Sequence, residues 1–95
     1  MLFIIHARDK PDALPARLAS YEAHKAYLAR CGELGVDMVM SGPLVADDGA
    51  RMIGSFLLVD APDRATVERF NAGDPFHAAG IWADVAITAF IRRVG

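Results

Sequence analysis

The chain has 95 residues, of which 54% are hydrophobic, and its mean hydropathy is +0.25. This length fits a single domain over residues 1–95, and we expect part of the apolar surface to face another subunit, because a small domain has little interior in which to bury it. Ten basic residues oppose 12 acidic ones, giving a formal net charge of −2. No basic stripe could follow a phosphate backbone, which excludes nucleic acid as an expected partner.

The first residues and the single cysteine indicate where the protein works. The apolar opening stops at His6 without a basic leader. No stretch reaches the roughly 18 apolar residues of a membrane span, so we expect a cytoplasmic protein that does not contact membranes. Cys31 is the only cysteine, which rules out an intrachain disulfide and a cysteine-cluster metal site and favours a small buried thiol in a reducing compartment.

The first half of the chain predicts a strand followed by a long helix. Residues 2–8 are β-branched and aromatic and end at the breaker cluster 9–12, which is typical of a strand and its exit. A helix is predicted over about 14–34, because Pro15 is acceptable in a first turn, Gly35 is placed to end it, and apolar residues recur at helical intervals. The recurring residues are Leu14, Leu18, Tyr21, Leu28 and Leu34.

The second half predicts a hairpin, a helix and a last strand. A strand is expected at 37–41, and the polar segment 47–50 contains the Asp-Gly pair typical of a hairpin turn into a strand at 53–59. A second helix is expected over about 62–71, and 82–91 alternates as a last strand. The order βαββαβ predicts a ferredoxin-like α+β domain, an antiparallel sheet with both helices on one face.

The predicted strands are apolar on both sides, which points to a partner. In the last strand Ala86 and Phe90 point opposite to Val85 and Ile87. Helices can cover only one of these faces. We therefore predict a homodimer in which two sheets pack face to face.

His24 and Asp74 are the leading candidates for chemistry. An unperturbed imidazole titrates at about pH 6.5, so a partly enclosed histidine can accept and return a proton at neutral pH. The alternative is that a lone helical histidine beside an apolar stripe simply packs in the core or an interface. Asp74 could fix the tautomer of His24, but its position before Pro75 also fits an N-cap of a short helix over 76–79, and capping alone would explain it.

Other residues could line a substrate pocket. Ser41-Gly42-Pro43 follows the predicted second strand, where Gly-Pro lets the backbone approach a small ligand and leaves Ser41 exposed, although a plain strand-to-loop turn is the simpler interpretation. His6 could line the same cavity or pack across the sheet.

One more basic residue and one more aromatic residue complete the set. Arg17 lies about two helical turns before His24 and could anchor an anionic substrate, or it could be a solvated surface residue. Phe76, with Tyr21 and Trp82, could form an aromatic wall or belong to the core. The histidine and acid spacings match no metal motif, so neither a metal nor another cofactor is expected.

These pieces together resemble the YciI (YCII-related) family. The resemblance covers essentially the whole chain and is carried by the order and spacing of short motifs. They are the opening strand 1–5 ending in Ala7-Arg8-Asp9, Arg17-Leu18, Ala23-His24, Gly42-Pro43 after the second strand, and Asp74-Pro75-Phe76 with Ala79-Gly80.

The resemblance implies a domain of the dimeric α/β-barrel superfamily with an active site around His24 and Asp74, and with Ser41, Gly42 and Pro43 near the pocket. A relative is a dehydrochlorinase of a chlorinated hydroxyquinol, and muconolactone isomerases share the superfamily fold. The implied chemistry is therefore acid–base work on small cyclic compounds. Relatives can carry an arginine and a proline just before the histidine, where this chain has Tyr and Glu, so a substrate-anion contact from that stretch is not implied.

Two classes of function follow. The first is a cofactor-free enzyme in which His24 is the general acid or base, Asp74 orients it, and Ser41 or the backbone around Gly42 steadies a developing oxyanion. The second is a non-catalytic module that binds a small ligand or a partner in the same cleft, and a purely structural dimer is a third reading. The position of His24 relative to Asp74 and to a cavity discriminates between them.

Overall fold

The computed structural model describes residues 1–95 and has the predicted order of elements. It contains four strands, three α-helices and one short 3-10 helix, η1. They are β1 (Leu2–Asp9), α1 (Leu14–Ala29), η1 (Cys31–Leu34), β2 (Asp37–Val45), β3 (Met52–Asp60), α2 (Arg64–Ala72), α3 (Pro75–Ala78) and β4 (Trp82–Phe90).

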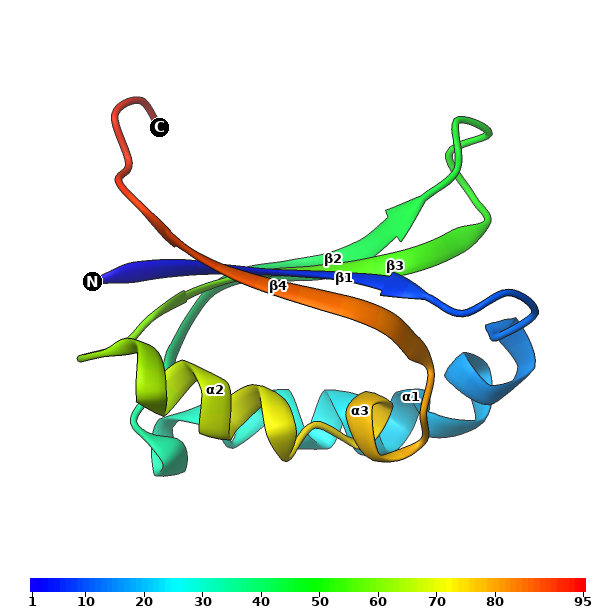
Figure 1. Ribbon diagram of the computed structural model, residues 1–95, viewed down its shortest axis with the longest axis horizontal. Helices are drawn as coiled ribbons and strands as arrows, with labels where there is room; N and C mark the ends of the chain where they lie inside the picture. Colours follow the sequence, from blue (N-terminus) through cyan, green and yellow to red (C-terminus); the bar gives the residue numbers. More distant parts are fainter.

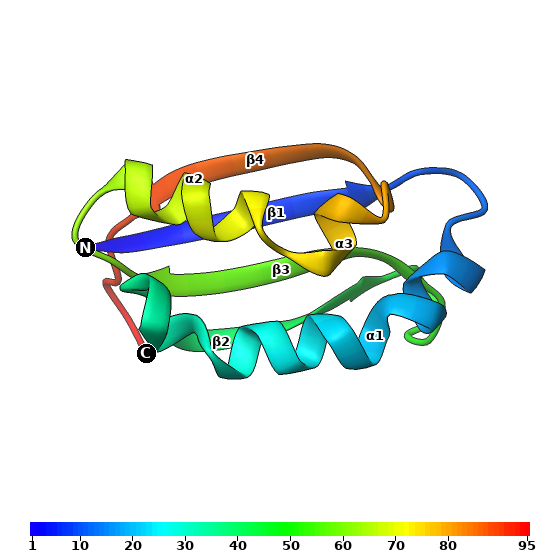
Figure 2. The same ribbon diagram turned by 90° about the horizontal axis from the view of Figure 1, so that it is seen from below.

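The strands form one antiparallel sheet in the order β2-β3-β1-β4, which is a ferredoxin-like arrangement. All three α-helices lie on the same face of this sheet, and the other face has no element over it (Figure 1). Seen from the helical side, α1 runs along β2, α2 covers β1 and β4, and α3 lies between β1 and α1 (Figure 2). The predicted α+β class, with helices on one face, is confirmed.

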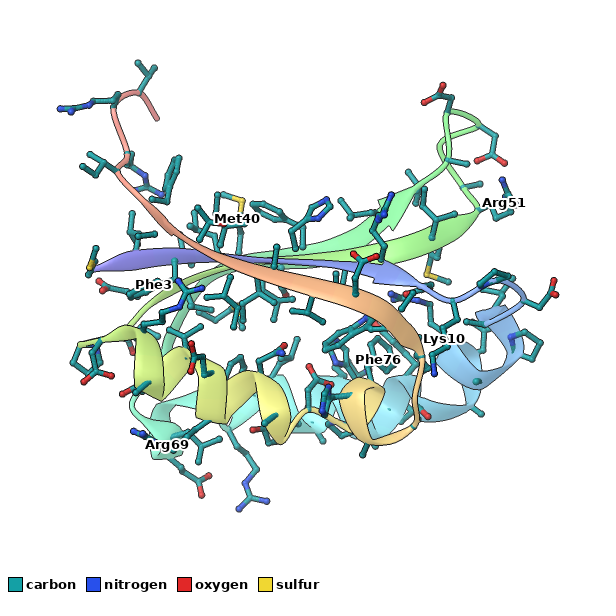
Figure 3. All side chains as sticks on the ribbon, viewed as in Figure 1. Phe3, Lys10, Met40, Arg51, Arg69 and Phe76 are labelled. Carbon is teal, nitrogen blue, oxygen red and sulfur yellow. The ribbon has the colours of Figure 1, made fainter.

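The apolar core lies between the sheet and the helices in two parts. Figure 3 shows Phe3 and Phe76 in this layer, at opposite ends of the sheet. The larger part joins the inward faces of β1 and β3 to α2, and the smaller part packs under the end of the sheet next to α3. The smaller part consists of Ala7, Phe76, Ile81 and Trp82. It contains the start of α3, so the core itself holds Asp74 in place.

The second strand is longer than expected, because β2 continues to Val45 instead of ending at residue 41. The expectation of a strand-to-loop turn at Ser41-Gly42-Pro43 is therefore wrong. β2 is an edge strand, and a proline, which lacks a backbone N–H, is tolerated at an edge where no second neighbour needs that donor. Pro43 is paired with Ser55 of β3.

The long helix predicted over 14–34 is divided. α1 stops at Ala29, and η1 completes the segment up to Gly35, whose φ of 78° ends it. The expected apolar stripe is also not the buried one, because Leu14, Leu18 and Leu34 are exposed. The side of α1 that faces the sheet instead buries polar residues, which are described below.

The uncovered face of the sheet carries many apolar side chains. Met40 points away from the helices (Figure 3) and is 53% exposed. Leu2 and Ile4 of β1, which pair with Phe90 and Thr88 of β4, are half-buried on this same face. No helix of the protein combines the length and apolar character needed to cross a bilayer.

Candidate functional site

A cavity of about 210 Å³ opens between α1, the β2–β3 edge of the sheet and α3. Thirteen residues line it, and six of them are predicted site residues, beginning with His24 on α1 and Ser41, Gly42 and Pro43 on β2. Arg17 and Phe76 line it as well. A cavity of about 150 Å³ engineered into another protein binds benzene. The space here is therefore sufficient for one substituted six-membered ring.

His24 and Asp74 meet behind the wall of this cavity. Nδ1 of His24 lies 2.8 Å from Oδ1 of Asp74, and both residues are buried, with exposed fractions of 8% and 1%. The same Oδ1 accepts a hydrogen bond from the backbone N–H of Phe76 at 2.9 Å. An ionised carboxylate only accepts hydrogen bonds, so Nδ1 of His24 carries the proton.

The other ring nitrogen of His24 is free. Nε2 has no hydrogen-bond partner in the protein, and among fully buried side-chain nitrogen and oxygen atoms only Nε1 of Trp82 is left without one. Nε2 is therefore not sealed in the interior, and His24 lines the cavity. A neutral imidazole that donates through Nδ1 keeps a lone pair on Nε2. This nitrogen is the one that a ligand in the cavity can meet.

The short helix α3 is built to present these groups. Asp74 is its N-cap and Pro75 its first residue, as the sequence predicts, because proline needs no N–H donor there. The cap places the ring of Phe76 flat against the imidazole of His24, with centroids 3.9 Å apart and an interplanar angle of 3°. Trp82 meets the same phenyl ring edge-on at 6.0 Å. The aromatic group therefore belongs to both the core and the cavity wall.

Arg17 is a buried part of the site, so the alternative of a solvated surface residue is wrong. Its guanidinium donates through Nε and Nη2 to both carboxylate oxygens of Asp9, at 2.8 and 3.0 Å, and through Nη2 to the hydroxyl of Ser55 at 2.7 Å. The guanidinium carbon lies 4.7 Å from the centre of the Phe76 ring. These contacts fix the group rigidly, while Nη1 donates to no protein atom.

His6 is not part of the cavity. Side chains alternate along a strand, and Ile5 and Ala7 face the helices, so His6 points to the uncovered face, where it is paired with Phe56 and Ala86. The expectation that it lines the same pocket is wrong for this chain, and the cross-strand alternative describes its position.

Several cavity residues were not predicted as substrate-binding residues, and the polar ones among them are Ser55, Lys25 and Tyr21, of which Tyr21 was predicted only as part of a possible aromatic wall. Ser55 is only 3% exposed and faces inward, on the same face of β3 as Leu57 and Val59. A hydroxyl at a core-facing position of an otherwise apolar strand was the available signal. Tyr21 and Lys25 line the mouth of the cavity, and both lie one turn of α1 or less from His24, which was the signal for them.

The pKa of Tyr27, which packs against the core, is affected by the charge of the site. Burial raises the pKa of its hydroxyl above the usual 10.0, and the nearby negative charge of Asp74 raises it further. The hydroxyl donates to the backbone carbonyl of Phe70 at 2.7 Å. Tyr27 therefore stays a neutral donor.

Comparisons with known proteins show the family of the chain and support its fold. The YCII-related domain family matches residues 1–91. Protein YciI of Escherichia coli O6:H1 is 30% identical over 95 residues, covering 95% of this chain and 96% of the relative, and an uncharacterized protein of Haemophilus influenzae is 32% identical over 97 residues with the same coverage. A solved structure of 5-chloro-2-hydroxyhydroquinone dehydrochlorinase (TftG) from Burkholderia phenoliruptrix AC1100, in complex with 2,5-dihydroxybenzoquinone, has a TM-score of 0.85 and 33% identity, covering 98% of this chain and 96% of that one.

Proposed function

The chain belongs to the YCII-related family, and from this premise we propose that it is an enzyme that uses His24 for general acid–base chemistry on a small, ring-shaped organic substrate. The observation that carries the proposal is the orientation of the imidazole. A buried carboxylate holds Nδ1 at 2.8 Å, which leaves Nε2 for a ligand in the cavity. A histidine held in this way can take a proton from a substrate and return it without a cofactor.

Each neighbour has a role in this proposal. Asp74 fixes the tautomer of His24 and stabilises the imidazolium that forms when Nε2 takes a proton. Arg17 offers Nη1 to a substrate oxygen. Ser41 and the backbone of Gly42 line the opposite wall, where they can donate to negative charge that develops on the substrate.

The substrate class is a small hydroxylated ring. The TftG structure holds 2,5-dihydroxybenzoquinone and belongs to a dehydrochlorinase of a chlorinated hydroxyhydroquinone. The cavity of this chain is of the right size for one such ring. The stack of Phe76 on His24 holds the imidazole in one orientation beside this space. We therefore expect an elimination or an isomerisation, in which a proton leaves one position of the ring as a leaving group departs or a double bond moves.

The test is turnover of candidate substrates by the purified protein. Chlorinated and non-chlorinated hydroxyhydroquinones are supplied, and chloride release and the quinone absorbance are followed. General acid–base transfer contributes roughly 10² to 10⁴ in rate, so His24→Ala must lose at least about 10²-fold in kcat with the fold intact by circular dichroism. An unchanged rate in this variant rejects the assignment. Tight binding without turnover by the wild type identifies the protein instead as a small-ligand-binding module.

We also propose that the protein is a homodimer joined through the uncovered face of the sheet. Support comes from the apolar character of that face, on which Met40 is 53% exposed, since monomers rarely expose a contiguous apolar patch of this kind. Size-exclusion chromatography with light scattering is expected to give twice the chain mass of 10.2 kDa at micromolar concentration. A clean monomer there contradicts the proposal, and Met40→Glu is expected to produce that monomer.

A further inference from the structure

The walls of the cavity carry positive charge that is not balanced by acidic residues of the same walls. The 13 lining residues include the cationic Arg17 and Lys25 and no aspartate or glutamate. The two nearby carboxylates stand behind this wall. Asp9 is 2.8 Å from Arg17 and Asp74 is 2.8 Å from His24. A ligand in the cavity therefore meets cationic and neutral groups only.

The buried charges are matched, whereas Lys25 is not. Arg17 is held by a buried carboxylate through two hydrogen bonds, so their charges largely cancel at a distance. The only acidic partner of Lys25 is Glu22, 3.4 Å away, and the side chains of these two residues are 60% and 82% exposed. An ion pair this exposed is weak because water screens it. Lys25 thus contributes the surplus positive charge of the site.

The position of Lys25 suits contact with a ligand. It follows His24 directly in α1, and its Nζ lies 5.4 Å from the ring centre of Tyr21, one turn earlier on the helix. A cation over an aromatic face at an exposed site is held only loosely. Lysine also has a flexible stem with a compact charge at its end. The ammonium group can therefore leave the Tyr21 ring and reach an oxygen at the mouth of the cavity.

We propose that Lys25 is a specificity-determining residue that selects ligands carrying an ionised oxygen on a small ring. The inference rests on the proposed function, in that it takes the cavity beside His24 as the substrate site. Arg17 supplies a fixed donor deep in the cavity, and Lys25 supplies mobile charge at the entrance. The ionised oxygen can be a ring-bound phenolate or enolate, or a carboxylate on the ring, and both present the same negative charge to an ammonium group.

Binding at pH 8 of three probes that share one ring tests the inference. The probes are 4-nitrophenol, which is mostly a phenolate at this pH, 4-nitroanisole, which is its uncharged methyl ether, and 4-nitrobenzoate. Affinities come from calorimetry and from quenching of the single tryptophan, Trp82, whose ring lies 6.0 Å from that of Phe76 in the cavity wall. The measured quantity is the affinity for an anionic probe divided by the affinity for the anisole. This ratio is compared between variants, so that differences in probe shape, which are the same for every variant, do not affect the comparison.

In Lys25→Met we expect this ratio to fall about fivefold, the value of an exposed ion pair at the strong end of its range. Lys25→Arg should restore most of it. The matched control is Lys10→Met, which makes the same chemical change at the chain's other lysine, outside the cavity lining, and should leave the ratio unchanged. Whichever anionic probe loses affinity in Lys25→Met identifies the source of the charge as a ring oxygen or a carboxylate.

Three results would overturn the inference. They are equal affinity of the wild type for the anionic and neutral probes, no binding of any probe at millimolar concentration, and a full anion preference retained in Lys25→Met. These measurements need no turnover. If the proposed acid–base function fails but the anion preference still depends on Lys25, the cavity is a binding site for anions. If the protein turns over substrate but the preference does not depend on Lys25, it is an enzyme whose selectivity arises from other residues.

Discussion

Replacing Asp74 with asparagine separates the charge of this side chain from its geometry. One oxygen, Oδ1, accepts hydrogen bonds from both Nδ1 of His24 and the backbone N–H of Phe76. The backbone donor cannot be reversed, so the asparagine oxygen must take this position and its amide group the other. The variant therefore keeps Nδ1 of His24 protonated and keeps the N-cap of α3, at which asparagine and aspartate are equally good. It loses only the negative charge.

The expected rate loss follows from that charge. Hydrogen bonds to charged groups contribute about 1 to 1.5 kcal/mol more than neutral ones, and two charges about 4 Å apart at an effective dielectric constant of 20 interact by about 4 kcal/mol. These values bracket the loss of imidazolium stabilisation, and at about 1.4 kcal/mol per factor of ten they correspond to a roughly 10- to 1000-fold lower kcat. In a serine protease, an aspartate-to-asparagine change that leaves the wrong histidine tautomer costs about 10⁴-fold.

The assay is steady-state turnover of the substrate found for the wild type, with the thermal midpoint of unfolding measured in parallel. Asp74→Asn should unfold within about 8 °C of the wild type, which is about 1 kcal/mol for a domain of this size. Asp74→Ala is the comparison, since it leaves the buried N–H of Phe76 unpaired at a cost of about 1 to 3 kcal/mol. An unchanged kcat in Asp74→Asn refutes the stabilisation of the imidazolium by the charge of Asp74. A loss near 10⁴-fold refutes the expectation that Nδ1 of His24 stays protonated in this variant.

Three further predictions concern stability and ionisation. Gly73→Ala brings a Cβ against the half-buried Tyr27 hydroxyl and should lower the urea-unfolding free energy by about 1–3 kcal/mol, whereas Gly32→Ala, with no neighbour within 4 Å, should not. Arg17→Met leaves a buried carboxylate without its cation and should cost about 3–5 kcal/mol in the same measurement; a loss below 1 kcal/mol contradicts the buried pair. The pKa of Tyr27 should fall partway toward 10.0 in Asp74→Asn when tyrosinate absorbance is titrated, because burial still raises it but the charge no longer does. Since the folded-state pKa is raised, the stability that Tyr27 contributes below about pH 10 is lost as the pH rises further, and an unmoved titration in Asp74→Asn contradicts the contact.

The sequence predicts the fold well because its strongest signals are local. Alternation in the strands, the Asp-Gly hairpin and the Asp74-Pro75 helix start each act within a few residues, and each is present where expected. The end of the second strand was predicted wrongly, because Gly-Pro is a turn signal in isolation. Pro43 remains in the strand only because β2 lies at the edge of the sheet, and edge position is a property of the whole topology.

The candidate site was harder to predict, because its residues break the rule that the buried side of a helix is apolar. Leu14 and Leu18 give α1 a helical pattern, yet they are exposed, while Arg17 and His24 are buried. The partners that make this burial tolerable lie far along the chain, and Asp74 is 50 residues from His24. Periodicity cannot reveal such compensation, because it comes from charges on other elements.

Stability and the proposed chemistry depend on the same short segment of the chain. Phe76 is completely buried in the smaller core cluster, and its ring also packs against both His24 and Arg17. Its backbone N–H helps to fix the carboxylate that orients the histidine. A large change at Phe76 would therefore lower activity through loss of packing, whatever the reaction. Only substitutions that keep the shape of α3, such as Asp74→Asn, can assign a rate loss to chemistry, and Lys25, which is exposed and outside the core, is the cavity position where charge can be altered with the least effect on the fold.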